Sequence, residues 1–295
     1  AHVWVADVPK GQRFLCLFDG QGLLQRAASP RRRATAEVET SGRSTLRFQA
    51  GDIEPFENVQ DAELFMSPSF GWMVNYLPIA SIDHATRTLR TAIPGTYPLS
   101  SYGRWRQDPE EQAKLGLFGT RPPRDLPKPG VGDFSSYAET VKTYCIENAL
   151  PYLSGPGQWV LDSRQGRLYL WPRDDQNPGQ SILYPRLREI IRLEGDFEQR
   201  RWAQHIRIQG LTLKHTERLS WHEGRIGVQH DWDCFDLGYA AVRLRGAQYC
   251  AVERCRFEHS GGSAVRLDRY AVGNTIRANE MRELGGAGVT LIGYG

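Results

Sequence analysis

The stretch GGSAVRLDRYAVGNTIRANEMRELGGAGVTLIGYG, residues 261–295, contains one short phrase twice: a pair of glycines followed by a Val-x-Leu pattern. The Val-x-Leu pattern occurs at Val242, Val265 and Val289, at steps of 23 and 24 residues. A second apolar column, from Val252 to Ile276, has the same 24-residue step. Apolar alternation with a period of two is typical of β-strands, and glycines mark the corners between them. Such units are too small to bury their own apolar faces, so they stack on one another.

The repeat predicts an all-β protein in which residues 196–295 form the first rungs of a parallel β-solenoid, most simply a right-handed parallel β-helix. A chain of 295 residues exceeds one ordinary single-core domain, so we expect a second domain over residues 1–195. The repeat stops in mid-pattern. Because an uncapped solenoid end leaves strand edges unpaired, we expect the solenoid to be truncated at its C-terminus and the chain to be a fragment.

Residues 1–195 contain the signals of a β-rich domain. FLCLFDGQGLLQRA, residues 14–27, places strand-like flanks around Asp19-Gly20, which is a hairpin signal. QWVLDSRQGRLYLWP, residues 158–172, has two alternating strands joined by a turn in which Gly166 suits a positive φ. We therefore predict two hairpins in this domain.

Composition excludes several classes of function. The formal charge of +3 is nearly balanced, which argues against nucleic-acid binding, and no apolar run is long enough to span a membrane. The five cysteines are scattered without a C-x-x-C pair, so neither a zinc site nor a disulfide framework is predicted. Dinucleotide, phosphate-loop and Gly-x-Ser-x-Gly motifs are absent from the sequence. We expect a monomer that binds neither nucleic acid nor membrane.

Three segments carry a resemblance to a known group: QHDWDCFDLGYAAVRLRGAQYCAVERCRFEHSGGSAVRLD (229–268), GGAGVTLIGYG (285–295) and GPGQWVLDSRQGRLYLWPRD (155–174). They resemble right-handed parallel β-helix proteins of polysaccharide-degrading bacteria, among them glycoside hydrolases of the α-L-fucosidase and xylanase type. The resemblance implies a sandwich-like domain inserted near the start of the solenoid, a polysaccharide or oligosaccharide substrate, and a secreted or periplasmic location. It implies no cofactor.

A glycosidase needs a proton donor and a second carboxylate, and alternation along the solenoid strands indicates where they lie. If Val265 and Leu267 point inward, Arg266 and Asp268 point outward, with Asp268 stacked over Arg245. An Asp-rich insert over residues 227–238 leads into the preceding strand. We predict that Asp233 or Asp236 from this insert works against Asp268. The predicted substrate-binding residues are Trp221, His230, Asp231, Trp232, Arg243 and Arg266.

Three other interpretations stay open. In the first interpretation, Asp268 simply pairs with Arg245, and the insert is a solvated turn because Asp readily bonds its own backbone. Alternatively, the protein is a polysaccharide lyase for a uronate-containing glycan, with Arg266 as the base and Asp231, Asp233 and Asp236 as calcium ligands. In the third interpretation the solenoid binds glycans without turnover. Outside the lyase alternative we expect no metal.

Overall fold

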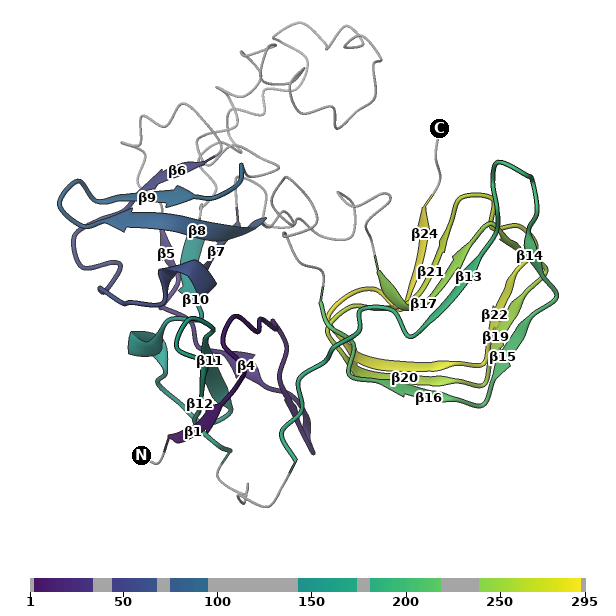
Figure 1. Cartoon of the computed structure of the whole chain (residues 1–295), viewed down its shortest axis with the longest axis horizontal. Coiled ribbons are helices and arrows are strands. Elements are labelled where there is room, and N and C mark those ends of the chain that lie inside the picture. Colours follow the sequence, from purple (N-terminus) through teal and green to yellow (C-terminus); the bar gives the residue numbers. More distant parts are fainter. Residues whose placement is uncertain are drawn as a thin grey trace, which may run out of the picture. The chain divides into compact units, whose positions relative to one another are not determined.

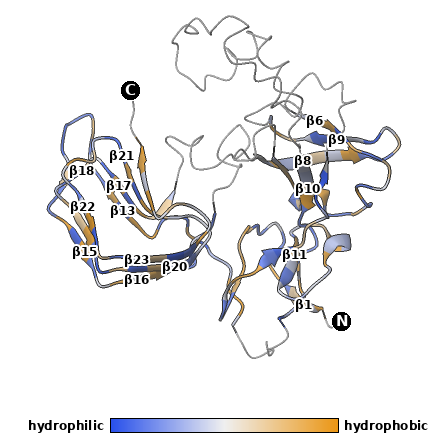
Figure 2. Cartoon of the chain, turned by 180° about the vertical axis from the view of Figure 1, so that it is seen from behind, coloured by the Kyte–Doolittle hydropathy of each residue, from blue (hydrophilic) through white to orange (hydrophobic). Residues whose placement is uncertain are grey.

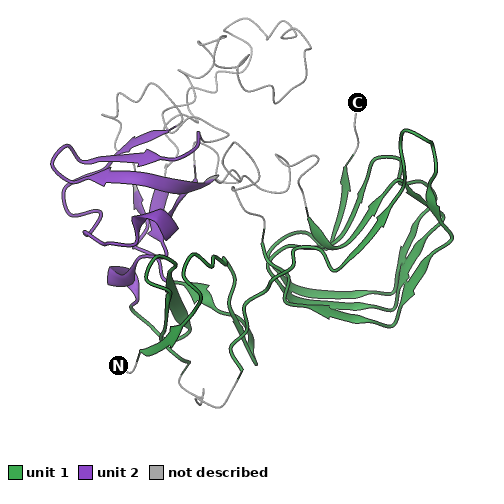
Figure 3. Ribbon diagram, viewed as in Figure 1, with its two compact units in different colours: residues 1–26, 154–220, 234–295 green, residues 27–153, 221–233 purple. Residues whose placement is uncertain are grey.

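A computed structural model describes residues 3–33, 44–67, 75–94, 143–173, 181–218 and 239–292. Nearly all regular structure in these ranges is β-strand, so the prediction of an all-β chain is confirmed for the described residues. The chain forms two compact units (Figure 3). Unit 1 contains residues 1–26, 154–220 and 234–295, and unit 2 contains residues 27–153 and 221–233. This division differs from a boundary near residue 195, and that boundary stays a prediction.

The first part of unit 1 is a small sheet that contains the second predicted hairpin. Its strands lie in the order β1 (Trp4–Asp7), β12 (Arg167–Leu170), β11 (Gln158–Asp162) and β4 (Gln25–Arg26). Strands β11 and β12 are antiparallel, and Gly166 in their turn has a φ of 73°. The other predicted hairpin is also confirmed, by the antiparallel strands β2 (Phe18–Asp19) and β3 (Gly22–Leu23). Phe14, Trp159 and Leu161 are among the apolar side chains that form the core of this part.

The second part of unit 1 is a stack of parallel strands (Figure 1). We call the sheet of β13 (Ile191–Glu194), β17 (Ala240–Arg245), β21 (Ser263–Asp268) and β24 (Val289–Ile292) the front sheet. The other parallel sheets are β14 (Ala203–Gln204) with β18 (Ala247–Gln248); β15 (Arg207–Gln209), β19 (Ala251–Glu253) and β22 (Thr275–Arg277); and β16 (Thr212–Lys214), β20 (Arg256–Ser260) and β23 (Glu280–Leu284). Successive turns of the chain visit these sheets in the same order. We call β13–β16 the first rung, β17–β20 the second and β21–β23 the third; β24 follows the third.

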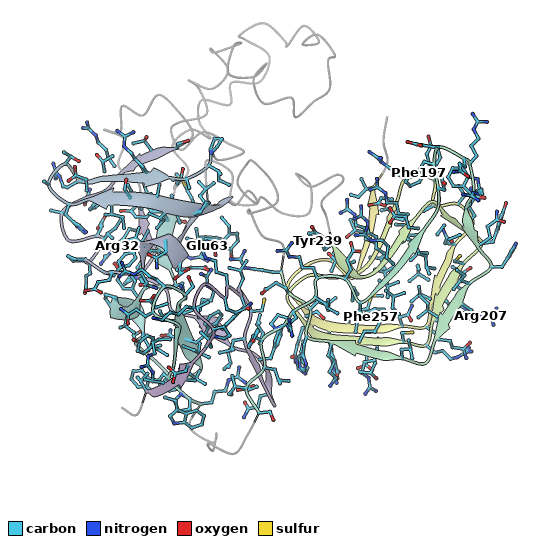
Figure 4. The ribbon with its side chains drawn as sticks, in the orientation of Figure 1. Arg32, Glu63, Phe197, Arg207, Tyr239 and Phe257 are labelled. Carbon is cyan, nitrogen blue, oxygen red and sulfur yellow. The ribbon has the colours of Figure 1, made fainter. Side chains whose placement is uncertain are left out.

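The register of the rungs confirms the repeat read from the sequence. Val242, Val265 and Val289 are partners on neighbouring strands of the front sheet. Val252 pairs with Ile276 on the sheet of β15, β19 and β22. Inward-pointing side chains from successive rungs, Phe257 among them, form one apolar core (Figure 4). Figure 2 shows the same alternation as hydrophilic and hydrophobic residues following one another along these strands. The handedness of the stack and the predicted truncation stay predictions.

Asparagine side chains join the second rung to the third at two turns. The Oδ1 atom of Asn279 accepts a hydrogen bond from the backbone N–H of Cys255, and its Nδ2 donates to the carbonyl of Val252, both at 2.9 Å. Asn274 bonds in the same way to Cys250 N–H and to the carbonyl of Ala247. These side chains therefore add hydrogen bonds between the second and third rungs at the turns, beside the backbone bonds of the strands.

Replacing Asn279 with Ala is expected to lower the free energy of unfolding by about 1–3 kcal/mol, because two partly buried backbone groups of the second rung each lose a hydrogen bond. Urea unfolding followed by circular dichroism measures the loss. Gln209→Ala, at an exposed position of β15, is the control and should change stability by less than about 0.5 kcal/mol. Equal effects of the two substitutions would contradict the role given to Asn279.

Unit 2 is built on one sheet of six strands. Their order is β5 (Arg32–Arg33), β10 (Thr143–Glu147), β7 (Glu63–Ser67), β8 (Asn75–Asp83), β9 (Thr88–Thr91) and β6 (Thr45–Arg47). Neighbouring strands are antiparallel. Two short 3₁₀ helices, Val59–Asp61 and Leu150–Tyr152, flank strands of this unit. Leu64, Leu77 and Ile146 are among the residues of its core.

The described cysteines are buried and free. They are Cys16, Cys145, Cys250 and Cys255, while Cys234 lies outside the described residues. Burial raises the pKa of the Cys145 thiol to about 12 and also raises that of Cys16, so both act as small apolar side chains. Within the described ranges, no helix has the length and apolar character needed to cross a bilayer.

Candidate functional site

Charged residues on two of the parallel sheets alternate in sign from rung to rung. On the sheet of β15, β19 and β22, Glu253 lies between Arg207 and Arg277, with ion-pair distances of 3.6 and 2.7 Å. Arg207 extends outward from its strand in Figure 4. On the sheet of β16, β20 and β23, Glu258 lies in the same way between Lys214 and Arg282. Opposite charges on facing positions stabilise neighbouring strands, so these two columns have an ordinary structural explanation.

Glu258 gives the stack a measurable pH dependence. Hydrogen bonds from Lys214 and Arg282 lower the pKa of Glu258 from 4.5 to about 2. The folded state therefore favours the ionised form of Glu258 more than the unfolded chain does. The resulting contribution to the free energy of unfolding is fully present above about pH 4.5 and disappears as the pH falls to about 2.

Urea unfolding of the wild type and of Glu258→Gln from pH 7 to pH 2 tests this dependence. The wild type should be the more stable protein above pH 4.5, and the difference should shrink toward zero as the pH falls to about 2. Glu280→Gln, at an exposed position of β23, serves as the control with a smaller change. A difference that stays constant over the whole range would contradict the assignment.

The front sheet breaks this rule of alternating charge. Arg192, Arg243 and Arg266 are register partners on β13, β17 and β21. Like charges on directly facing positions destabilise a sheet, so this column requires carboxylates from elsewhere. Departures from local consistency of this kind are expected at functional sites.

Two carboxylates of the described residues contribute to the compensation. Oδ2 of Asp268 accepts hydrogen bonds from Nε and Nη2 of Arg243, at 3.1 and 2.6 Å, and from Nε of Arg266 at 2.9 Å. Glu189, just before β13, places Oε1 at 3.3 Å from Nη1 of Arg243 and Oε2 at 2.6 Å from Nε of Arg192. We call Glu189, Arg192, Arg243, Arg266 and Asp268 the arginine–carboxylate cluster.

The centre of this cluster is buried, which differs from the outward polar strip that the sequence predicts. Asp268 and Arg266 are 1% exposed and Arg243 is 2% exposed. Alternation indicates the side of a strand on which a side chain lies, but not whether that side is covered. Mutual pairing of the charges offsets the cost of burial. The structure thus brings together three of the predicted site residues, Arg243, Arg266 and Asp268.

The expected pairing of Asp268 with Arg245 is replaced by another arrangement. The two residues are register partners, but the Asp268 carboxylate bonds to Arg243 and Arg266. Arg245 instead forms an ion pair of 3.3 Å with Glu194, and its guanidinium lies 5.2 Å from the ring centre of Phe197. Long arginine side chains reach diagonal neighbours on a sheet, so register alone does not decide which groups pair.

Within the described part of the chain, one oxygen of Asp268 has no hydrogen-bond partner. Its Oδ1 atom is buried, and no described group donates to it. A buried oxygen in this state costs free energy and needs an explanation, for example an unmade contact to a ligand or water. Oδ2 already accepts hydrogen bonds from three arginine N–H groups, which can act only as donors. Oδ1 is therefore the oxygen of Asp268 that remains able to accept a further hydrogen bond.

Six predicted site residues lie outside the described residues: Trp221, His230, Asp231, Trp232, Asp233 and Asp236. Their assignments stay predictions. Sequence reasoning missed Glu189, because it precedes the first strand and has no place in the 23- and 24-residue columns. Its position three residues before Arg192 was the available signal. Among the described residues, no group of three or more His, Cys, Asp or Glu side chains could hold a metal ion.

Two histidines of the parallel stack have structural contacts. The ring of His215 lies 4.8 Å from Phe18 and 6.4 Å from His259, measured between ring centres. His259 pairs with Glu283 at 2.5 Å. Burial, followed by the charge of His259, lowers the pKa of His215. These contacts belong to the packing of β2 and β3 against the rungs rather than to the arginine–carboxylate cluster.

Comparison with known proteins finds a solved structure with a similar fold. No protein-family model and no curated protein matches the sequence. The fold is similar to that of a solved glycoside hydrolase. That structure superposes with a TM-score of 0.60 and 20% sequence identity, over 98% of this chain and 50% of the other. The chain thus spans half the length of its structural neighbour. At this identity the similarity concerns the fold, and the chemistry has to be argued from the side chains.

Proposed function

We propose that the protein is a glycoside hydrolase that acts on a plant or microbial polysaccharide through a pair of carboxyl groups. The unpartnered Oδ1 of Asp268, inside a buried arginine–carboxylate cluster, is the observation that carries this proposal. A buried carboxylate fixed on one oxygen and unpartnered on the other is suited to contact a reacting group. The fold similarity to a glycoside hydrolase adds support for a carbohydrate substrate.

In this proposal Asp268 is the base or nucleophile of the pair. Arg243 and Arg266 hold Oδ2 in place, which leaves Oδ1 directed to the substrate or to an attacking water. Asp233 or Asp236 supplies the proton to the leaving group. Trp221 and Trp232 stack on sugar rings, while His230 and Asp231 bind hydroxyl groups. Arg243 and Arg266 serve mainly to position Asp268, and Glu189 positions Arg243.

The proposal includes the finer description of the fold. The rungs would form a right-handed parallel β-helix of the kind found in glycoside hydrolases of the α-L-fucosidase and xylanase type. Parallel strands joined by crossovers are right-handed in nearly all known cases, which supports this handedness. We further propose a monomer that works in the periplasm or outside the cell. Fractionation of the source organism and light scattering of the purified protein test these two points.

The decisive experiment incubates the protein with a panel of plant and algal polysaccharides and follows reducing ends together with ultraviolet absorbance. New reducing ends without the absorbance of an unsaturated uronate are the expected result. Reducing ends accompanied by that absorbance would replace the hydrolase with a lyase, and added calcium would then be tested for activation. If the protein binds a polysaccharide of the panel but releases no reducing ends from it, the protein is a glycan-binding protein without turnover.

A further inference from the structure

The corner that follows the front sheet differs in length between rungs. Register places Glu194, Arg245 and Asp268 side by side at the ends of their strands. In the second rung a single residue, Gly246 with a φ of 61°, leads from β17 to β18. This is the shortest corner of the three, and glycine makes it without strain.

The first and third rungs carry extra residues at this same corner. Residues 195–202 separate β13 from β14 in the first rung. In the third rung Asp268 follows Arg245 by 23 residues, whereas Val272 follows its partner Gln248 by 24, so one residue has been added between them. In repeat proteins, insertions of this kind gather on one face, which is often the binding face.

The extra residues bring three aromatic rings together. Phe197 and Trp202 come from the first rung and Tyr270 from the third. The ring centres are 5.2 Å apart for Trp202 and Tyr270, 5.8 Å for Phe197 and Tyr270, and 6.1 Å for Phe197 and Trp202. Figure 4 places Phe197 at the end of the strands of the front sheet. We call these three residues the aromatic corner.

The exposure of Tyr270 argues that the aromatic corner does more than fill space. Tyr270 is 63% exposed, so its ring adds little to the apolar core. Arg269 and Tyr270 also have positive φ values, 34° and 59°, in succession. This backbone costs free energy for residues with a side chain, whereas the second rung uses glycine at the position equivalent to Arg269. Other corner residues of the rungs, Tyr249 among them, also have positive φ, so the added residue and the exposure of its ring distinguish Tyr270.

We propose that the aromatic corner is a binding subsite for a pyranose ring of the glycan substrate. This assignment rests on the proposed function, because the subsite adjoins the candidate site: Tyr270 is two residues beyond Asp268, and Arg245, the register partner of Asp268, lies against Phe197. Sugars present an apolar C–H face together with hydroxyl groups. Tyr and Trp match this pattern because each combines a large apolar ring with one polar group.

Affinity electrophoresis tests the subsite without requiring turnover. Wild type, Trp202→Ala, Tyr270→Ala and Tyr270→Phe are run in native gels that contain each polysaccharide of the panel. Tyr249→Ala is the matched control, because Tyr249 is 57% exposed and stacks on His205 at the next corner of the rungs. Unchanged circular dichroism establishes that each variant is folded.

The alanine variants at Trp202 and Tyr270 should bind the retarding glycan roughly tenfold more weakly, while Tyr270→Phe and Tyr249→Ala bind like the wild type. Equal retardation of all proteins, or no retardation of the wild type by any glycan, would overturn the subsite. Turnover is measured separately on the same panel. If Tyr270→Ala hydrolyses the glycan with an unchanged KM, the subsite is wrong and the proposed function stands. If binding depends on Tyr270 but no protein hydrolyses the glycan, the subsite stands and the proposed function is wrong.

Discussion

Under the proposed function, replacing Asp268 with Asn is expected to lower the rate of glycan hydrolysis by roughly 10²- to 10⁴-fold, the range expected when a carboxylate that transfers a proton is removed. Asparagine has nearly the same shape and keeps one oxygen that can accept from Arg243. It cannot act as a base or nucleophile. Binding of the glycan should therefore persist while kcat falls, and initial rates with a soluble oligosaccharide from the active polysaccharide measure both.

Glu258→Gln is the control for this experiment. Glu258 is likewise a buried carboxylate between two cationic side chains, Lys214 and Arg282. It lies on a different sheet, in a column where positive and negative charges alternate from rung to rung. Its removal should leave kcat within about twofold. If Asp268→Asn is folded, as judged by near-ultraviolet circular dichroism, and keeps full activity, Asp268 is not the catalytic carboxylate.

Replacing Arg243 with Met is expected to have the largest effect on stability. The substitution removes one cation from between Asp268 and Glu189, and it leaves the buried charge of Asp268 and the partly buried charge of Glu189 undercompensated. Breaking a buried ion pair from one side costs about 3–5 kcal/mol. Because Asp268 keeps Arg266 and Glu189 keeps Arg192, we expect a loss of about 3 kcal/mol, near the lower end of that range.

Urea unfolding at pH 7 measures this loss, with Arg207→Met as the control. Arg207 also pairs with a buried glutamate, but its side chain is largely exposed. A surface pair of this kind contributes about 1 kcal/mol or less. Losses of similar size for the two variants would mean that the arginine–carboxylate cluster is not the tightly coupled unit described above.

The strand columns could be predicted from sequence because the 23- and 24-residue steps fix the register directly. Val242, Val265 and Val289 could hardly take other partners without exposing their apolar side chains. The hairpin at Gly166 was predictable for a similar local reason, since its turn needs a positive φ.

The arrangement of the candidate site could be predicted only in part. Alternation identified Arg243, Arg266 and Asp268 as residues of one side of the front sheet, but burial and pairing depend on side chains from other strands and turns. Glu189 contacts Arg243 across 54 positions of the chain, and no short-range pattern reports such a contact. The aromatic corner was missed because its residues lie in insertions, which have no place in the columns of a repeat.

The parallel register of the front sheet has a consequence for the stereochemistry of the proposed reaction. Neighbouring rungs are separated by the ordinary strand spacing of about 4.8 Å. Carboxyl groups on adjacent rungs would thus lie near the separation of about 5 Å that retaining glycosidases use, and groups two rungs apart, at about 9.6 Å, would lie at the upper limit of the roughly 6.5–9.5 Å of inverting ones. For a partner on a strand of the stack, the number of rungs between it and Asp268 would therefore predict whether the sugar product keeps or inverts its anomeric configuration.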